Sequence, residues 1–349
     1  MVVELSVVRG RAPRKGARRA AESLGSAAPR IVEPLEALVA HSIEELDRSE
    51  WDSLFPGELE NWNYLRALER AALEPCDPVH FAIRSSGRVV AAAPGFVGRR
   101  ALAEPWRGKF RGQWRHARDR MLVLGSPLSA ASRIGFAAHA TAAEKTRLLE
   151  RILRSAHEEA AGLGVDVLVS GDDVEHGSPH RPFGALQSLA RMRGKATTRL
   201  SLPPWSFSDY LSCIDEPLHG ELIRVCALAA PYERDWHVDL ARDLEPMLAL
   251  CRDSGLDELN DAYFGNLLGP GASACCLVVR SDGALVGFSL LLHDARTLRE
   301  KLTVANRRVR RSLVRSLIWL ETVRFCLELG IGTFESSSEL SQAAAYTIR

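Results

Sequence analysis

The same order of predicted secondary-structure elements occurs twice along the chain, and this repetition limits the possible folds more than any other feature. In the second half, apolar periodicity and turn residues predict the order β-α-α-β-β-β-α-β. Those elements cover residues 232–238, 239–254, 257–268, 274–279, 285–293, 297–304, 308–329 and 331–335. The first half gives nearly the same order at 35–40, 43–54, 62–73, 79–83, 89–93, 121–124, 141–163 and 165–169, followed by a helix at 183–192 and a strand at 197–202. A duplicated domain is the simplest account, and two unrelated α/β domains are the alternative.

The predicted fold is therefore α/β (α+β), with two tandem domains, each a mixed, mostly antiparallel sheet flanked by helices. Asp282-Gly283 predicts a tight hairpin turn, because Asp-Gly readily adopts positive φ angles. Gly330 is a suitable end for the long helix 308–329. The predicted boundaries are a disordered basic leader at 1–34, a degenerate N-terminal domain at 35–202, a connecting segment at 203–231 and a C-terminal domain at 232–349.

The composition is that of an ordinary globular protein of two domains. The chain has 349 residues, of which 46% are hydrophobic and 26% charged, with a net charge of +1. This balance gives no global field for DNA or an anionic membrane. No apolar run approaches the ~20 residues of a membrane span, so no stable membrane insertion is expected.

The cysteines and the basic leader bear on localisation. The chain has seven cysteines, most of them inside apolar patterns, which predicts reduced and buried thiols of a cytoplasmic protein. The cysteines have no His or Cys partners at the spacing of a zinc site, so no metal site is expected. The leader lacks the apolar core of a secretory signal. Its Arg, Ala and Ser content fits an organellar transit peptide and a disordered bacterial leader equally well.

Four stretches of sequence carry a resemblance to a known family. In the first half they are residues 51–57 (WDSLFPG) and 62–69 (WNYLRALE), and in the second half residues 317–326 (LIWLETVRFC) and 335–338 (ESSS). Together with the element order, they resemble the GNAT, or acyl-CoA N-acyltransferase, superfamily, and within it the FemAB-like branch with duplicated GNAT domains. The resemblance covers roughly residues 36–345.

Two departures from the family pattern stand out. GNAT enzymes usually place a Gly-rich turn before the long helix, where backbone N–H groups meet the CoA pyrophosphate. Here residues 305–312 read ANRRVRRS and contain no glycine. Relatives also usually continue past the closing strand, so the second domain is expected to lack its last elements.

The arginines at this turn are the first candidate site. Arg308, Arg311 and Arg315 share one stripe of the predicted helix, and positive side chains are unfavourable at a helix N-terminus unless an anion is bound there. An ordinary solvated arginine-rich face is the alternative. The resemblance assigns acyl-CoA binding to this region, with the residues Val304, Arg307, Arg308, Arg311, Ser312 and Arg315.

Glu300 is the second candidate. Strict alternation in the strand 297–304 places it on one face with Leu298, Leu302 and Val304, where burial would suit it to act as a general base. A structural ion pair with Arg299 or Lys301 is the alternative.

Several weaker candidates have a structural interpretation that is at least as simple. Tyr263 is a candidate acid for the departing thiolate, although its helical spacing favours packing. Glu321 fits a surface partner of Arg324, and Ser336-Ser337-Ser338 fits an ordinary loop. In the first half, His176 and His180 fit a polar loop. The aromatic and basic segment 106–118 fits either a surface loop or a binding site for a phosphate- or sugar-rich ligand.

The resemblance implies an N-acyltransferase that moves an acyl group, acetyl above all, from acyl-CoA to an amine of a small molecule, peptide or cell-envelope precursor, without a metal. A Fem-type transferase that uses aminoacyl-tRNA is the second hypothesis, and only it implies tRNA as a partner. A non-catalytic binding protein with this fold is the third.

Overall fold

The structure is a computed structural model, and it describes residues 31, 34–74, 76–99, 120–127, 134–169, 198–216, 218–269, 274–307, 309–336 and 340–341. Several predicted features lie outside these ranges: nearly all of the leader 1–34, the helix 183–192, the segment 106–118, His176, His180, Arg308, Ser337 and Ser338.

The second half of the chain builds a six-stranded mixed sheet with the strand order β10-β11-β12-β13-β14-β9. Its strands are β10 (Tyr232–Asp235), β11 (Ala274–Ser281), β12 (Ala284–His293), β13 (Thr297–Ala305), β14 (Thr333–Ser336) and β9 (Thr198–Ser201). Every neighbouring pair is antiparallel except β13 and β14, which are parallel. The β11–β12 hairpin turns at Asp282 and Gly283, whose φ angles of 50° and 77° have the positive sign that the sequence predicts.

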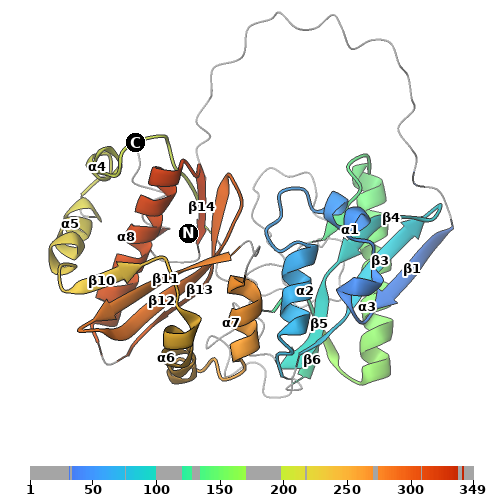
Figure 1. Cartoon of the computed structure of the whole chain (residues 1–349). Coiled ribbons are helices and arrows are strands. Elements are labelled where there is room, and N and C mark those ends of the chain that lie inside the picture. Colours follow the sequence, from blue (N-terminus) through green and yellow to red (C-terminus); the bar gives the residue numbers. More distant parts are fainter. Residues whose placement is uncertain are drawn as a thin grey trace, which may run out of the picture. The chain divides into compact units, whose positions relative to one another are not determined.

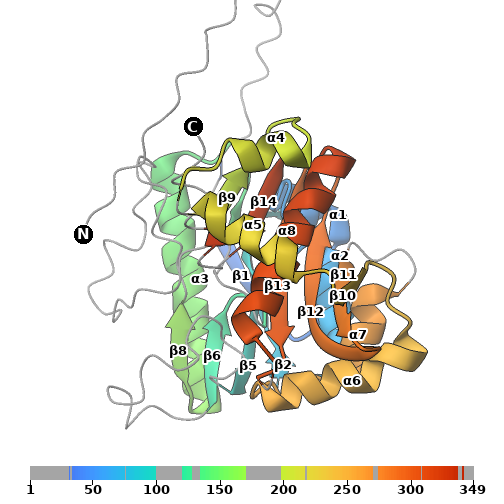
Figure 2. The ribbon, with the colours of Figure 1, turned by 90° about the vertical axis from the view of Figure 1, so that its left-hand side faces the viewer.

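Helices cover both faces of this sheet (Figure 1). One face carries α6 (Leu240–Asp253) and α7 (Asp261–Leu268). The other carries α8 (Arg311–Leu329), with α4 (Phe207–Ser212) and α5 (Leu218–Leu228) packed on α8. Figure 2 looks onto this second face and shows α4 and α5 in front of α8. The two faces enclose separate groups of buried apolar side chains.

The first half contains two four-stranded sheets, ordered β1-β3-β4-β7 and β2-β5-β6-β8. The strands are β1 (Leu35–Ala40), β2 (Cys76–Pro78), β3 (His80–Ser85), β4 (Arg88–Ala93), β5 (Gly95–Arg99), β6 (Arg120–Leu124), β7 (Gly135–Phe136) and β8 (Asp166–Val169). The N–H of Val79 donates to the carbonyl of Gly95 at 3.0 Å and links the sheets. A Cβ atom at Gly95 would lie 2.8 Å from the carbonyl oxygen of Val79, so this close approach requires glycine.

Helices α1 (Arg48–Leu54), α2 (Trp62–Arg70) and α3 (Ala142–Leu163) complete the first half. Thr141 and Glu144 form a reciprocal capping box at the start of α3, and Gly164 ends the helix at φ 65°. The predicted start and end of this helix are thus both explained by local hydrogen bonding.

The two halves pack against each other through α2 and α7, which lie side by side (Figure 1). The side-chain amide of Asn260 donates to the carbonyl of Ala71 across this contact at 2.8 Å. Both helices begin in the same way: Asn61 accepts from the N–H of Tyr64, and Asn260 accepts from the N–H of Tyr263. The same cap and tyrosine at equivalent helix starts support the duplicated architecture.

The strand pairing crosses the predicted domain boundary. Strand β9 falls inside the range 35–202 assigned to the N-terminal domain, yet it pairs with β14 of the second sheet. Helices α4 and α5, within the range 203–231 assigned to a connecting segment, contribute Tyr210 and Leu222 to the core under α8. The second sheet therefore takes strands from both sides of the predicted linker.

Several predicted elements differ in their bounds. The helix predicted at 43–54 is a 3-10 turn, Ile43–Glu45, followed by α1, because Asp47 caps a new helix through the N–H of Glu50. Helix α7 begins at its Asn260 cap rather than at residue 257, and α8 begins at Arg311 rather than at 308. The short strands β2, β5 and β7 were not predicted.

Candidate functional site

The parallel strands β13 and β14 separate along their length. Strand β13 has nine residues, and β14 pairs only with its first three, Thr297, Leu298 and Arg299. Among the described residues, the rest of β13 pairs only with β12 on its other edge. The carboxyl end of β13 therefore has one open edge, and open ends of parallel strands are common sites for ligands.

A β-bulge lies at the point where β13 leaves β14. Leu290 of β12 faces Leu302, whereas the next residue, Leu291, faces Glu300, so Lys301 is the extra residue on β13. A bulge interrupts the alternation of side chains and changes the face to which the following residues point. It also leaves backbone groups of the bulged strand outside the regular ladder.

This bulge overturns the predicted face of Glu300. Leu302 and Val304 belong to the core beneath α6 and α7, whereas Leu298 belongs to the core beneath α8. The cross-strand neighbour of Glu300, Leu291, also lies in the α8 core. The prediction that Glu300 shares a face with all three apolar residues is wrong, because strict alternation does not hold across Lys301.

Glu300 is half-buried, and its carboxylate accepts a hydrogen bond from the hydroxyl of Ser336 at the end of β14. Its charged sequence neighbours Arg299 and Lys301 pair with other carboxylates. Glu300 thus lies beside the separation of β13 and β14, on the side of α8.

Helix α8 begins next to the open end of β13, and its start differs from that of the other capped helices. Helices α1, α2, α3, α4, α6 and α7 each begin at an Asp, Asn, Ser or Thr whose side chain accepts from a first-turn N–H. The corresponding residue of α8 is Arg310, which makes no side-chain cap, and the first turn contains no acidic residue. Within the described residues, the first N–H groups of α8 therefore have no side-chain cap, and such groups can bind an anion.

The predicted arginines gather at this helix start. Arg307, Arg310, Arg311 and Arg315 are exposed, as is Ser312, and within the described ranges none of the four arginines pairs with a carboxylate. Partial burial lowers the pKa of Arg311, and the charges of Arg315 and Arg307 lower it further. These arginines repel one another, and a bound polyanion would relieve that repulsion.

The equivalent strands of the first half do not separate within the described residues. Strands β6 and β8 are also parallel, but they pair from Met121 to Leu124, along almost all of β6. Helix α3, which lies between these two strands in the sequence, is capped by Thr141 and carries the carboxylate of Glu144 in its first turn. An acidic, capped helix start repels anions, so the described part of the first half offers no counterpart to the arginine-flanked start of α8.

A buried set of charges, the interface charge cluster, joins the two halves on the other face of β13. Its members are Glu58, Glu60, Arg299, Lys301 and Glu335. Arg299 pairs with Glu58 and, at 2.6 Å, with Glu335, while Nζ of Lys301 lies 3.0 Å from Glu60. All five side chains are at most 12% exposed, which is tolerated because each charge has an opposite partner.

The pairing within this cluster sets its ionisation. Burial raises the pKa of Glu335, but Arg299 and Arg199 outweigh burial and hold the pKa below its usual value. Glu58 and Glu60 come from the loop between α1 and α2, so the first half fixes the start of β13 electrostatically. The sequence offered no signal for this cluster, because its partners lie far apart along the chain.

Tyr263 is fully buried at the interface between the halves, where its ring packs edge-on against Phe264. It lies in the core beneath α6 and α7, so the two predicted catalytic residues, Tyr263 and Glu300, are on opposite faces of the sheet. The structure brings Glu300 near Ser336 and brings the arginines together, but it does not bring Tyr263 to Glu300.

Glu321 does pair with Arg324, at 3.4 Å, as its spacing predicts. It is not a surface residue, however, because it is buried and also accepts from Arg234 at 3.2 Å. The helical spacing indicated Arg324 as the partner of Glu321. It did not indicate the burial of Glu321, which follows from the packing of β10 and α5 on α8.

All seven cysteines are free. Cys251, Cys276 and Cys326 are buried, while the other four are only half-buried, contrary to the prediction that all are buried. Burial raises the pKa of the Cys275 and Cys326 thiols to about 12, so these thiols are poor nucleophiles. Within the described ranges, no group of His, Cys, Asp or Glu is arranged to hold a metal ion.

Two solved structures share this architecture. A tandem GNAT protein from the clavulanic acid biosynthesis pathway matches with a TM-score of 0.57 and 14% identity, over 90% of this chain and 94% of the other. FemX matches with a TM-score of 0.51 and 13% identity, over 86% of this chain and 88% of the other. The chain has a tandem GNAT fold.

The predicted fold class is thereby confirmed. The separated strands β13 and β14 and the start of α8 belong to the second of its two halves. No protein-family model and no curated protein sequence matches the chain. No helix in the described ranges is long and apolar enough to cross a membrane.

Proposed function

We propose that the second half of this tandem GNAT protein is an N-acyltransferase that transfers an acyl group, such as acetyl, from acyl-CoA to an amine. The observation that carries this proposal is the open end of β13 beside an uncapped, arginine-flanked start of α8. Only the second half combines the two features among the described residues, since β6 and β8 stay paired and α3 is capped.

The residues around the start of α8 fit the phosphates of CoA. Arg307, Arg311 and Arg315 lie close enough to repel one another, and two negative phosphate groups would offset their charge. The N–H groups of the first turn, including that of Ser312, would bind the same anion. Arginine side chains would thus supply the donors that glycine backbone groups usually provide in this fold.

Bound acyl-CoA would supply an activated acyl group as a thioester. Glu300 is the proposed general base, because its carboxylate lies beside the separation of the strands and is held by the Ser336 hydroxyl. In this role it would take the proton from the attacking amine. Val304 lies on the opposite face of β13 and would contribute backbone rather than side-chain contacts. Tyr263 is not assigned the acid role, since it lies across the sheet from Glu300.

Thermal unfolding with added ligands tests the proposal. A ligand that binds only the native state stabilises it by about 2.7 kcal/mol at a hundred times its Kd. We expect acetyl-CoA and CoA to raise the Tm and bulk tRNA to leave it unchanged. The double variant Arg311→Gln/Arg315→Gln should lose most of the CoA-induced shift, whereas Arg252→Gln, which removes an exposed arginine on α6, should keep it.

The absence of any Tm shift at millimolar acetyl-CoA would refute acyl-CoA binding. A shift with tRNA instead would favour the Fem-type transferase, because exposed arginines also suit nucleic-acid phosphates. If acetyl-CoA binds but no amine is acylated, the protein is a binding protein that kept the fold.

The role of Glu300 is tested separately, by release of free CoA in the presence of a panel of amines. Glu300→Gln should lower kcat about a hundredfold or more while acetyl-CoA affinity stays within about twofold. Glu245→Gln, an exposed carboxylate on α6, is the matched control. Unchanged turnover in Glu300→Gln would exclude the base role.

A further inference from the structure

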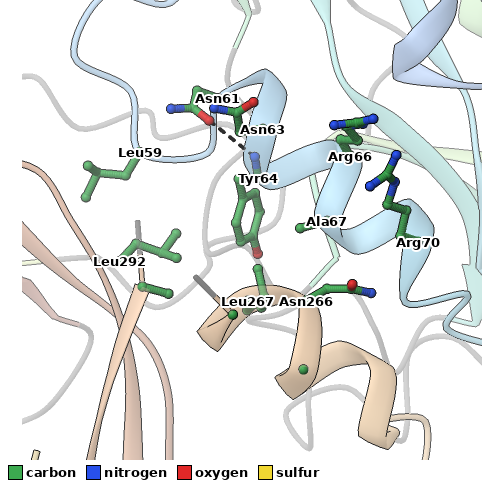
Figure 3. Close-up of a pocket in the computed structure, with 13 residues that line it drawn as sticks. Leu59, Asn61, Asn63, Tyr64, Arg66, Ala67, Arg70, Asn266, Leu267 and Leu292 are labelled. Carbon is green, nitrogen blue, oxygen red and sulfur yellow. Dashed lines mark hydrogen bonds between the residues drawn. The ribbon is translucent and has the colours of Figure 1, made fainter. Parts of the chain in front are cut away.

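A cavity of about 360 Å³ lies between α2 of the first half and α7 of the second (Figure 3). It is separate from the start of α8, because α7 and α8 cover opposite faces of the second sheet. The polar residues that line it are Asn61, Asn63, Tyr64, Arg66, Arg70 and Asn266. None of the described lining residues is acidic.

The two arginines have donors to spare. Nε of Arg66 and Nη2 of Arg70 both bind the same carboxylate oxygen of Glu44, at 2.5 and 3.3 Å. Two guanidinium groups share one carboxylate, so one positive charge at the rim of the cavity is not neutralised by this pair. Each guanidinium carries five N–H donors, of which this pairing uses only a few.

Tyr64 provides a second, independent sign of a ligand. Its side chain points from α2 toward α7, and the residue is only 6% exposed (Figure 3). Its hydroxyl interacts with the nearby hydroxyl of Ser126, but within the described part of the chain it makes no hydrogen bond of normal geometry. Ser126, the nearby hydroxyl, donates to Glu60 instead. Buried polar groups nearly always have a partner, so a polar group of a ligand is the natural partner here.

The character of the donors selects the ligand. Burial raises the pKa of Tyr64 well above its usual value, so its hydroxyl remains protonated and can donate. The side-chain oxygen of Asn61 is already used by the N–H of Tyr64, which leaves its amide donors. With arginine, amide and phenol donors and no carboxylate among its described lining residues, the cavity favours a ligand that presents acceptor oxygens and a negative charge.

We propose that this cavity binds a small carboxylate-bearing molecule of about amino-acid to dipeptide size. Its volume corresponds to roughly a dozen water-sized groups at ~30 Å³ each. The carboxylate would lie against Arg66 and Arg70, and the apolar part against Leu267 and Leu292. Because the lining comes from both halves, the ligand would hold α2 and α7 together.

The test uses the full chain and a panel of the twenty L-amino acids and their glycyl dipeptides, each compared with its C-terminal amide. At least one acid at 10 mM should raise the Tm by about 2 °C or more, and its amide should not. Arg70→Gln and Tyr64→Phe should each remove at least half of that shift. Arg120→Gln is the matched control, since Arg120 and Arg70 are 52% and 55% exposed and each pairs with one carboxylate.

Tyr64→Phe removes only a hydroxyl that makes no hydrogen bond of normal geometry within the described residues and interacts weakly with Ser126, so it should fold as well as the native protein. The proposal is overturned if no acid of the panel raises the Tm, or if both variants respond like the native protein. An equal shift with inorganic phosphate would overturn the assignment to carboxylates. The response to acetyl-CoA should be the same in both variants, so failure here is distinct from failure of the proposed acyltransferase.

Discussion

The start of α8 permits a substitution that should make the protein more stable and its acyl-CoA binding weaker. Arg310 occupies the cap position with φ −60° and ψ 78°. Asp239, at φ −87° and ψ 98°, has a similar backbone conformation and caps α6 by accepting from the N–H of Ala241 at 3.0 Å. Arg310→Asp should therefore place a carboxylate where it can cap α8.

The gain in stability follows from two known effects. An N-cap contributes about 1 kcal/mol, and exchanging a positive for a negative charge at a helix start adds ~0.5 kcal/mol. A total of about 1.5 kcal/mol corresponds to a rise in Tm of roughly 2 °C for a chain of this size. The measurement is urea unfolding followed by circular dichroism.

The loss in affinity follows from charge. Two unit charges ~6 Å apart in water interact by about 0.7 kcal/mol, and Arg310→Asp changes the local charge by two units. Acetyl-CoA should then bind about tenfold more weakly at low salt, as measured by titration calorimetry. Arg310→Gln, which removes the charge without adding a cap, should lower the affinity about threefold and change stability little.

The opposite signs make this test decisive. A variant that is merely misfolded would lose both stability and binding. If Arg310→Asp is more stable but binds acetyl-CoA as tightly as the native protein, the start of α8 does not hold the CoA phosphates. The proposed donor site would then have to be abandoned.

Three further predictions concern the core and the number of sites. Hydrogen bonds from Arg242 and Arg280 outweigh burial and lower the pKa of Asp243 to about 2. Asp243→Asn should therefore cost about 2 kcal/mol at pH 7, and the difference from the native protein should vanish as the pH falls from about 4 to 2, measured by urea unfolding at each pH. Gly95→Ala should destabilise by about 1–3 kcal/mol through contact with the Val79 carbonyl, whereas Gly162→Ala, in open space on α3, should stabilise by about 0.5–1 kcal/mol. Calorimetry should find one acetyl-CoA per chain, because the equivalent strands of the first half do not separate within the described residues.

Local signals in the sequence were sufficient for the elements themselves. The apolar stripe and Gly330 predicted the long helix, and Asp282-Gly283 predicted the hairpin turn, because these features depend on residues close in sequence. The clustering of arginines at the start of α8 could also be read from helical spacing. In each case the controlling interactions span fewer than about five residues.

Interactions between distant segments could not be read in this way. The bulge at Lys301 depends on the register between β12 and β13, and it reversed the face predicted from alternation. The pairing of β9 with β14 and the contact of Glu58 with Arg299 join residues that lie more than a hundred positions apart. Single-sequence periodicity contains no information about such partners, so the domain boundary and the interface charge cluster were beyond its reach.

Among the described residues, the two halves of the duplicated fold differ in whether their parallel strands separate. Both halves retain the Asn cap and the tyrosine that begin α2 and α7, and these helices form the contact between the halves. The halves differ where a ligand would bind: β6 and β8 stay paired above a capped α3, whereas β13 and β14 separate beside an uncapped α8. The capped start of α3 stabilises the first half, because the Thr141 side chain accepts a hydrogen bond from a first-turn N–H group of the helix. The first half then positions Glu58 and Glu60 against Arg299 and Lys301, so the start of the open strand is fixed by the half whose own described parallel strands stay paired.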